Sequence, residues 1–129
     1  MSGKFLLDTN IVIALFANDE NVLAQLKNAD EVFIPGIVLG ELYYGANKSS
    51  RSQANMARID EFAAENQVLA VDGQTARHYG EVKNALHIKG KLIPENDIWI
   101  AALSRQHQYT LVTQDNHFNE VEEIETIRW

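Results

Sequence analysis

The sequence predicts an α/β fold built on a short central parallel sheet. Short apolar segments recur along the chain, and each of them is typical of a buried strand. Longer segments with the apolar spacing of helices alternate with these strands, as expected of parallel strand–helix–strand units. Two helical segments in succession separate the second predicted strand from the third. Together these observations predict an α/β/α sandwich of four to five strands with a protruding helical hairpin.

The predicted strands are short and apolar, and they cover residues 4–7, 31–35, 68–71 and 110–113, with an edge strand within 124–129. The predicted helices begin at polar capping residues or follow a strand directly. They cover 10–17, a segment after Asn18 or Asp19 that carries Val22, Leu23 and Leu26, then 36–47, 49–66, 72–90 and 97–107. We find no internal repeat, low-complexity segment or linker, so residues 1–129 are expected to form one domain.

Composition limits the function classes. Hydrophobic residues make up 46% of the chain, which favours a folded protein over a disordered one. There is no cysteine, so disulfides and thiolate metal sites are excluded. No apolar segment has the length of a membrane helix or a signal peptide, and we expect a soluble cytoplasmic protein without membrane association. The net charge of −7 argues against a general polyanion-binding surface, but not against an enzyme that holds nucleic acid through metal ions.

Four acidic residues occupy comparable places beside the predicted strands. Asp8 and Asp115 each follow a strand, and Glu41 lies about one helical turn after the second strand. Asp97 begins the helix that leads into the fourth strand. Ligands of open α/β sheets bind beyond the carboxyl ends of the strands. We therefore expect these four carboxylates to converge on one edge of the sheet.

Each acid taken alone also has a simpler explanation. Asp8 and Asp115 suit the polar turns that follow strands, and either Asn96 or Asp97 could cap the next helix. Glu41 could face solvent on its helix, although apolar neighbours surround it in the sequence. The four acids together favour a common site over four separate structural roles.

Converging carboxylates repel one another unless a cation lies between them. Oxygen ligands select hard ions, so Mg²⁺ or Mn²⁺ is expected, and such clusters commonly hydrolyse phosphodiesters. A zinc site is not expected, because no pair among the histidines has metal-ligand spacing: His78, His87, His107 and His117. The chain also lacks a phosphate-binding glycine loop and the G-x-S-x-G motif of serine hydrolases.

The segments "FLLDTNIVI", "GELYYGA", "NDIWIAA" and "TLVTQDNHF" resemble the four signature blocks of PIN-domain ribonucleases. More narrowly, they resemble the VapC-type toxins of bacterial toxin–antitoxin pairs, and the likeness spans residues 4–129. The resemblance implies a PIN-like fold and a Mg²⁺- or Mn²⁺-dependent endoribonuclease. It also implies that Asp8, Glu41, Asp97 and Asp115 are the catalytic metal ligands.

Polar neighbours of these acids are candidate supporting residues: Thr9, Asn10, Asn96, Thr113 and Asn116. In the family a further acid sometimes follows the last of these four acids. Asn116 and His117 stand there in this chain, which puts a site of five carboxylates in doubt. The sequence leaves open whether Glu41 or a water molecule acts as the general base.

The resemblance further implies a homodimer, and a small VapB-like antitoxin that binds along the helical hairpin and directs a basic side chain at the acids. The leading substrate is tRNA, in particular the anticodon stem-loop of initiator tRNA. Candidate RNA contacts are the basic residues of two small clusters, Lys48 and Arg51, and Lys89 and Lys91, for which ordinary solvated surface is the alternative. Two other functions stay open: a catalytically silent RNA- or protein-binding PIN module, and a DNA-directed nuclease of the wider superfamily.

Overall fold

The computed structural model describes residues 3–129 and contains a five-stranded parallel sheet. In sequence order the strands are β1 (Lys4–Leu7), β2 (Glu31–Pro35), β3 (Gln67–Leu69), β4 (Thr110–Val112) and β5 (Thr126–Ile127). Their order across the sheet is β3-β2-β1-β4-β5, and every neighbouring pair is parallel. The predicted parallel sheet and its C-terminal edge strand are thereby confirmed.

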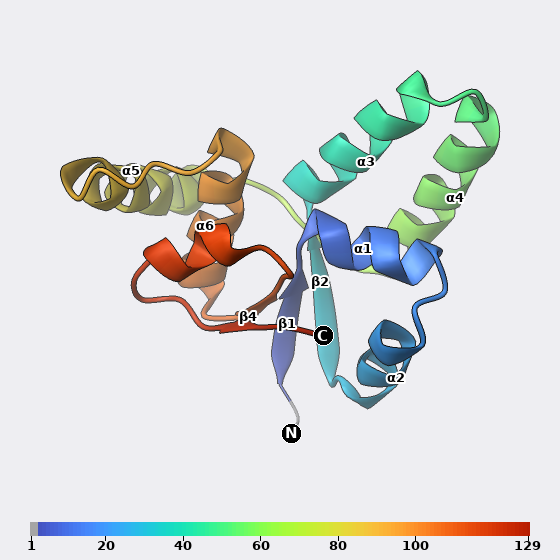
Figure 1. The fold of residues 1–129 in the computed structure, drawn as a ribbon, viewed down its shortest axis with the longest axis horizontal. Helices are drawn as coiled ribbons and strands as arrows, with labels where there is room; N and C mark the ends of the chain where they lie inside the picture. The colour runs from blue at the N-terminus through green and yellow to red at the C-terminus, as the bar shows by residue number, and fades with distance from the viewer. Residues whose placement is uncertain (1–2) are drawn as a thin grey trace.

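Helices flank this sheet, which confirms the predicted layers. They are α1 (Thr9–Phe16), α2 (Glu20–Asn28), α3 (Gly36–Lys48), α4 (Ser52–Glu65), α5 (Gly73–Ile88) and α6 (Glu95–His107), with a short 3₁₀ helix η1 (Asn116–Glu120). In Figure 1, α5 and α6 lie to one side of β1 and β2, whereas α1 to α4 lie to the other. None of the helices in residues 3–129 combines the length and apolar character needed to cross a membrane.

The core is formed by strands that are hydrophobic on both faces and by the buried helix α6. Leu6 and Leu7 of β1, Ile34 of β2 and Leu111 of β4 are at most 1% exposed. Helix α6 buries Ile98 and every residue from Ile100 to Ser104. Burial of large aliphatic side chains contributes roughly 1.5–3 kcal/mol each, so this central packing fixes where the strand ends lie.

Helices α3 and α4 form the predicted hairpin, which projects away from the sheet in Figure 1. Val38 and Leu42 of α3 are buried, and Ile59 and Phe62 of α4 are buried opposite them. These residues recur at three- and four-residue spacing, so each helix directs one apolar face inward. The hairpin therefore places the first two turns of α3, including Glu41, directly beyond the end of β2.

Several predicted boundaries differ from the structure. Helix α6 begins at Glu95, two residues earlier than predicted, directly after Pro94, which is the N-cap residue with ψ 145°. Neither Asn96 nor Asp97 caps this helix, so that alternative for Asp97 is wrong. Strand β3 ends at Leu69, and strand pairing near the C-terminus covers Thr126–Ile127 only. The 3₁₀ helix η1 was not predicted, since five residues carry little periodicity.

Candidate active site

Asp8 lies where β1 ends and α1 begins. Its backbone N–H still pairs with the carbonyl of Val112, 3.0 Å away, so the sheet holds this residue in place. Its side chain accepts a 2.8 Å hydrogen bond from the N–H of Thr9 and caps α1. Asp8 therefore does cap a helix, as its simpler explanation holds. Capping does not account for the second carboxylate oxygen, which is turned toward other polar groups.

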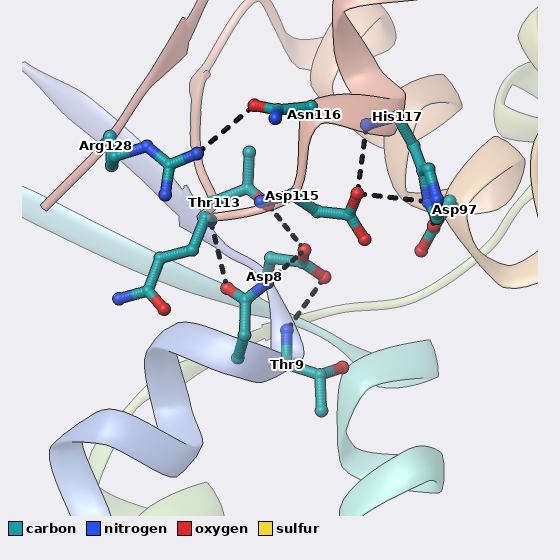
Figure 2. A network of polar contacts seen from close by, with 10 residues as sticks. Asp8, Thr9, Asp97, Thr113, Asp115, Asn116, His117 and Arg128 are labelled. Carbon is teal, nitrogen blue, oxygen red and sulfur yellow. Dashed lines mark hydrogen bonds and ion pairs between the residues drawn. The ribbon is translucent and has the colours of Figure 1, made fainter.

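That second oxygen, Oδ2, is held by side chains from both ends of the sequence. The hydroxyl of Thr113 donates to it at 2.7 Å (Figure 2). Nδ2 of Asn10 donates to the same oxygen at 3.4 Å. Asn10 also accepts a hydrogen bond from the N–H of Gln114 through Oδ1. Asp8 as a whole is only 5% exposed, and these contacts fix the orientation of its carboxylate.

Glu41 lies across from Asp8 on α3. It is half-buried, which argues against the alternative of a fully solvent-facing helix residue. Its Oε1 accepts a 2.9 Å hydrogen bond from the hydroxyl of Thr9, so Thr9 contacts both Asp8 and Glu41. One threonine therefore ties the first and second predicted acids together.

Asp97 and Asp115 form the opposite side of the site, together with a histidine. Nδ1 of His117 lies 3.1 Å from Oδ2 of Asp97 and 3.1 Å from Oδ1 of Asp115 (Figure 2). The backbone N–H of His117 also donates to Oδ1 of Asp115 at 2.9 Å, which makes Asp115 the cap of η1. Sequence reasoning left His117 out of the site, because it searched for paired histidines rather than for one histidine two residues after an acid.

All four predicted acids line one cleft of about 510 Å³ at the carboxyl ends of β1, β2 and β4. The cleft is lined by residues of the β1–α1 corner, of α3, of the start of α6 and of the turn after β4: Asp8, Thr9, Asn10, Ile13, Glu41, Pro94, Glu95, Asn96, Asp97, Asp115 and His117. Asn116 is not among them, since its Oδ1 accepts a hydrogen bond from Arg128. The structure therefore brings the predicted acids together and places Asn116 outside the group.

Glu95 is a fifth acid at the cleft that sequence reasoning missed. Unlike the others it is paired, because Tyr79 and Lys83 of α5 both donate to its carboxylate. The hydrogen bond from Lys83 is the main reason why the pKa of Glu95 is lowered. Both oxygens of the Glu95 carboxylate thus already have hydrogen-bond partners on α5, so this carboxylate is not free to bind a ligand.

Asp8 and Asp97 are in the opposite situation. Burial raises the pKa of Asp8, and the charges of Asp97 and Glu41 raise it further, against the hydrogen bonds from Thr113 and Thr9. Burial also raises the pKa of Asp97, with an additional contribution from Asp115 and an opposing one from His117. Within residues 3–129 no lysine or arginine lines the cleft. Apart from His117, whose protonated ring can pair with Asp97 and Asp115, the described lining offers these carboxylates no cationic partner that would offset their repulsion.

This donor set fits a divalent cation. Asp97, Asp115 and His117 offer ligand atoms that all lie within 4.8 Å of one another, and Asp8 and Glu41 complete the acidic lining. Buried carboxylates that would repel one another are stabilised by a metal ion, and oxygen-rich sites suit Mg²⁺ and Mn²⁺.

The candidate RNA contacts lie apart from the cleft. Lys48 and Arg51 lie at the turn between α3 and α4, where the Lys48 ammonium is 4.8 Å from the centre of the Tyr44 ring. Lys89 and Lys91 lie beyond the end of α5, and Lys89 pairs with Glu120 at 3.9 Å. In Figure 1 these two turns are the outer ends of the helical arms on either side of the site. None of these four basic residues lines the cleft, although Lys89 contacts η1, the short helix that also carries His117.

Comparison with known proteins identifies the family. A family model described as "PIN domain" matches residues 5–124. A protein named Ribonuclease VapC2 from Haemophilus influenzae is 38% identical over 127 residues, covering 97% of this chain and 95% of the relative. A protein named tRNA(fMet)-specific endonuclease VapC from Salmonella typhimurium is 35% identical over 127 residues, with the same shares covered.

A solved structure described as DNA-bound VapBC from Salmonella typhimurium has the same fold. It superposes with a TM-score of 0.92 at 30% sequence identity and covers 98% of both chains. The fold, the acidic cleft and the relatives all indicate the same family, and the relatives match essentially the whole sequence. The chain therefore belongs to the PIN-domain family and, within it, to the VapC-type nucleases.

Proposed function

We propose that this protein is a Mg²⁺- or Mn²⁺-dependent endoribonuclease, the toxin of a VapBC-like toxin–antitoxin pair. The observation that carries the proposal is the convergence of Asp8, Glu41, Asp97 and Asp115 on one cleft, with no lysine or arginine among the described residues that line it. These four side chains would hold the ion. When bound, it would supply an activated water and neutralise charge on the scissile phosphate.

The chain's own contribution is to fix the acids before substrate arrives. Thr113 and Asn10 hold one oxygen of Asp8, and the N–H of Thr9 holds the other. Thr9 also orients Glu41 through its hydroxyl. Preorganised ligands of this kind lower the reorganisation needed in the transition state, which is how supporting residues contribute to hydrolysis.

We propose tRNA as the substrate class, with the anticodon stem-loop of initiator tRNA as the leading target. Support comes from the relative of Salmonella typhimurium whose name states tRNA(fMet) specificity and which matches 97% of this chain. The open cleft lies between two projecting helical arms, and this arrangement suits a folded RNA better than a small molecule.

We also propose that a small VapB-like antitoxin regulates the enzyme, and that the enzyme acts as a homodimer in the cytoplasm. A groove of about 290 Å³ runs between α1, α3 and α4, with apolar walls that include Phe16, Leu42 and Ile59. Thr9 and Glu41 line this groove as well as the acidic cleft. A peptide bound along the hairpin could therefore carry a basic side chain to the carboxylates.

The test is a cleavage assay with purified protein. Initiator tRNA, elongator methionine tRNA, ribosomal RNA and single-stranded DNA are incubated with Mn²⁺, with Mg²⁺ or with EDTA. We expect cleavage of initiator tRNA that requires the metal and is lost in Asp8→Asn. The matched control is Asp30→Asn, which removes one charge from an exposed position outside the cleft and should keep activity.

Other results would point to other functions. Cleavage that persists in EDTA, or in Asp8→Asn, would contradict the metal mechanism. Digestion of DNA in preference to RNA would identify a DNA-directed nuclease. RNA binding without cleavage under any metal condition would identify a silent binding module.

A further inference from the structure

Among the described residues that line the acidic cleft, His117 is the one whose side chain carries a potential nitrogen ligand. It belongs to η1, the short helix that follows the turn after β4. Its side chain is 48% exposed and faces the two acids rather than the core (Figure 2). The backbone N–H of the same residue is bonded to Asp115, which fixes the ring's point of attachment relative to that acid.

The spacing of the three side chains matches a metal coordination sphere. Nδ1 of His117 lies 3.1 Å from one oxygen of Asp97 and 3.1 Å from one oxygen of Asp115. Adjacent ligand atoms around an octahedral ion with bonds of about 2.1 Å are separated by about 3.0 Å. An ion placed between these atoms would therefore need little movement of the two acids or of the imidazole.

We propose that His117 is a ligand of the catalytic metal and makes the site selective for Mn²⁺ and other transition ions over Mg²⁺. This inference rests on the proposed metal-dependent function. Imidazole nitrogen binds transition ions more strongly than Mg²⁺, whereas carboxylate oxygen serves both. A site of acids alone would discriminate little, and the added nitrogen shifts the preference toward Mn²⁺ and Co²⁺.

The first test detects the nitrogen directly and needs no substitution. Mn²⁺-loaded protein is studied by pulsed electron paramagnetic resonance, with and without selective ¹⁵N labelling of histidine. We expect a ¹⁴N coupling typical of a directly bound imidazole, and its replacement by a ¹⁵N coupling on labelling. The other histidines, His78, His87 and His107, do not line the cleft, so the signal would come from His117.

The second test uses paired variants. His117→Ala should abolish the nitrogen coupling and weaken Mn²⁺ binding by about tenfold or more, while the affinity for Mg²⁺ changes far less. The control is His87→Ala, at an exposed position on α5 outside the cleft, which should keep both the coupling and the affinities. Competition between Mn²⁺ and Mg²⁺, followed through the signal of free Mn²⁺, measures the ratio of the two affinities in each variant.

Three outcomes separate this inference from the proposed function. Loss of the coupling in His117→Ala alone supports the inference. Mn²⁺ that binds and supports RNA cleavage without any histidine coupling overturns it and leaves the ribonuclease intact. A wild-type protein that neither binds Mn²⁺ nor cleaves RNA overturns both.

Discussion

The hydroxyl of Thr113 donates a 2.7 Å hydrogen bond to Oδ2 of Asp8, across 105 residues of sequence. Both residues are buried, at 5% exposure each. The same hydroxyl oxygen accepts the N–H of Asp115 at 3.0 Å, so Thr113 links the first predicted acid to the last. This contact follows from the pairing of β1 with β4, which brings the ends of the two strands together.

Replacing Thr113 by Val keeps the side-chain volume and removes the hydroxyl. We expect RNA cleavage to fall by about 10–100-fold, because Asp8 loses a fixed orientation and Asp115 loses a partner for its N–H. Thr113→Ser restores the hydroxyl and should recover most of the activity. Cleavage rates at saturating Mn²⁺ measure the effect, and a Val variant as active as wild type would show that this contact does not position the site.

Asp8→Asn separates catalysis from folding. Burial and neighbouring acids destabilise the Asp8 carboxylate in the metal-free protein, as its raised pKa indicates. A neutral amide of the same shape should abolish cleavage and should stabilise the fold in EDTA at neutral pH, which thermal unfolding would show as a higher Tm. A lower Tm would mean that the capping role of Asp8 dominates.

The fold could be predicted because its signals are local. Short apolar strands alternating with helices reveal a parallel sheet, and a strand such as Lys4–Leu7 has the predicted boundaries. The predicted boundaries of helices and strands were wrong where a single residue or a tertiary contact determines the end of the element. The start of α6 at Glu95 depends on Pro94, and the two-residue strand Thr126–Ile127 depends on pairing with β4.

The candidate site could be predicted in part for a related reason. The acids were found because each follows a strand or begins a helix, positions that a parallel sheet brings together. The roles of His117 and Glu95 depend on side-chain contacts between elements, with Asp97 and with Lys83, which no sequence spacing displays. The distance of Lys48 from the cleft likewise depends on the direction in which the hairpin projects.

Metal binding should stabilise the folded protein through Asp97. Ions that bind only the native cleft raise the free energy of unfolding by about 2.7 kcal/mol at 100 times their Kd. We expect Mn²⁺ to raise the Tm of the wild-type protein, and EDTA to reverse the increase. Asp97→Asn should lose most of this effect, and thermal unfolding with and without Mn²⁺ measures it. An unchanged Mn²⁺ effect in this variant would remove Asp97 from the ligand set.

The start of α5 should give the protein a local pH dependence. The N–H of Thr75 donates to the carboxylate of Asp72, and this hydrogen bond is the main reason why the pKa of Asp72 is lowered. A carboxyl whose pKa is lowered in the folded state adds to the free energy of unfolding at pH values above its unfolded-state pKa. This added stability is lost as the pH falls through the folded-state pKa.

Asp72→Ala should therefore lower the Tm at pH 6–7, and its difference from wild type should narrow below about pH 4. Asp72→Asn keeps an acceptor oxygen without a titrating group, so its stability should show no such dependence at this position. Thermal unfolding of the three proteins across this pH range is the measurement. A difference in Tm between Asp72→Ala and wild type that stays constant with pH would contradict the role of the Asp72 charge.

The basic residues at the ends of the two helical arms should affect RNA binding rather than the chemical step. Lys48 and Arg51 lie at the α3–α4 turn and Lys89 and Lys91 beyond α5, so none of them lines the cleft. Replacing either pair by alanine should raise KM several-fold and leave kcat unchanged. Each lost phosphate contact should also reduce the slope of log affinity against log salt by about 0.7–0.9.

Lys27→Ala provides the reference for this comparison. It removes one exposed cation from the end of α2, which precedes β2 and so lies at the opposite end of the strands from the cleft (Figure 1). We expect its KM and salt slope to equal those of wild type. Arm variants that also match wild type would show that these four residues are ordinary solvated surface. A fall in kcat would place one arm much closer to the scissile phosphate than its position in the free protein.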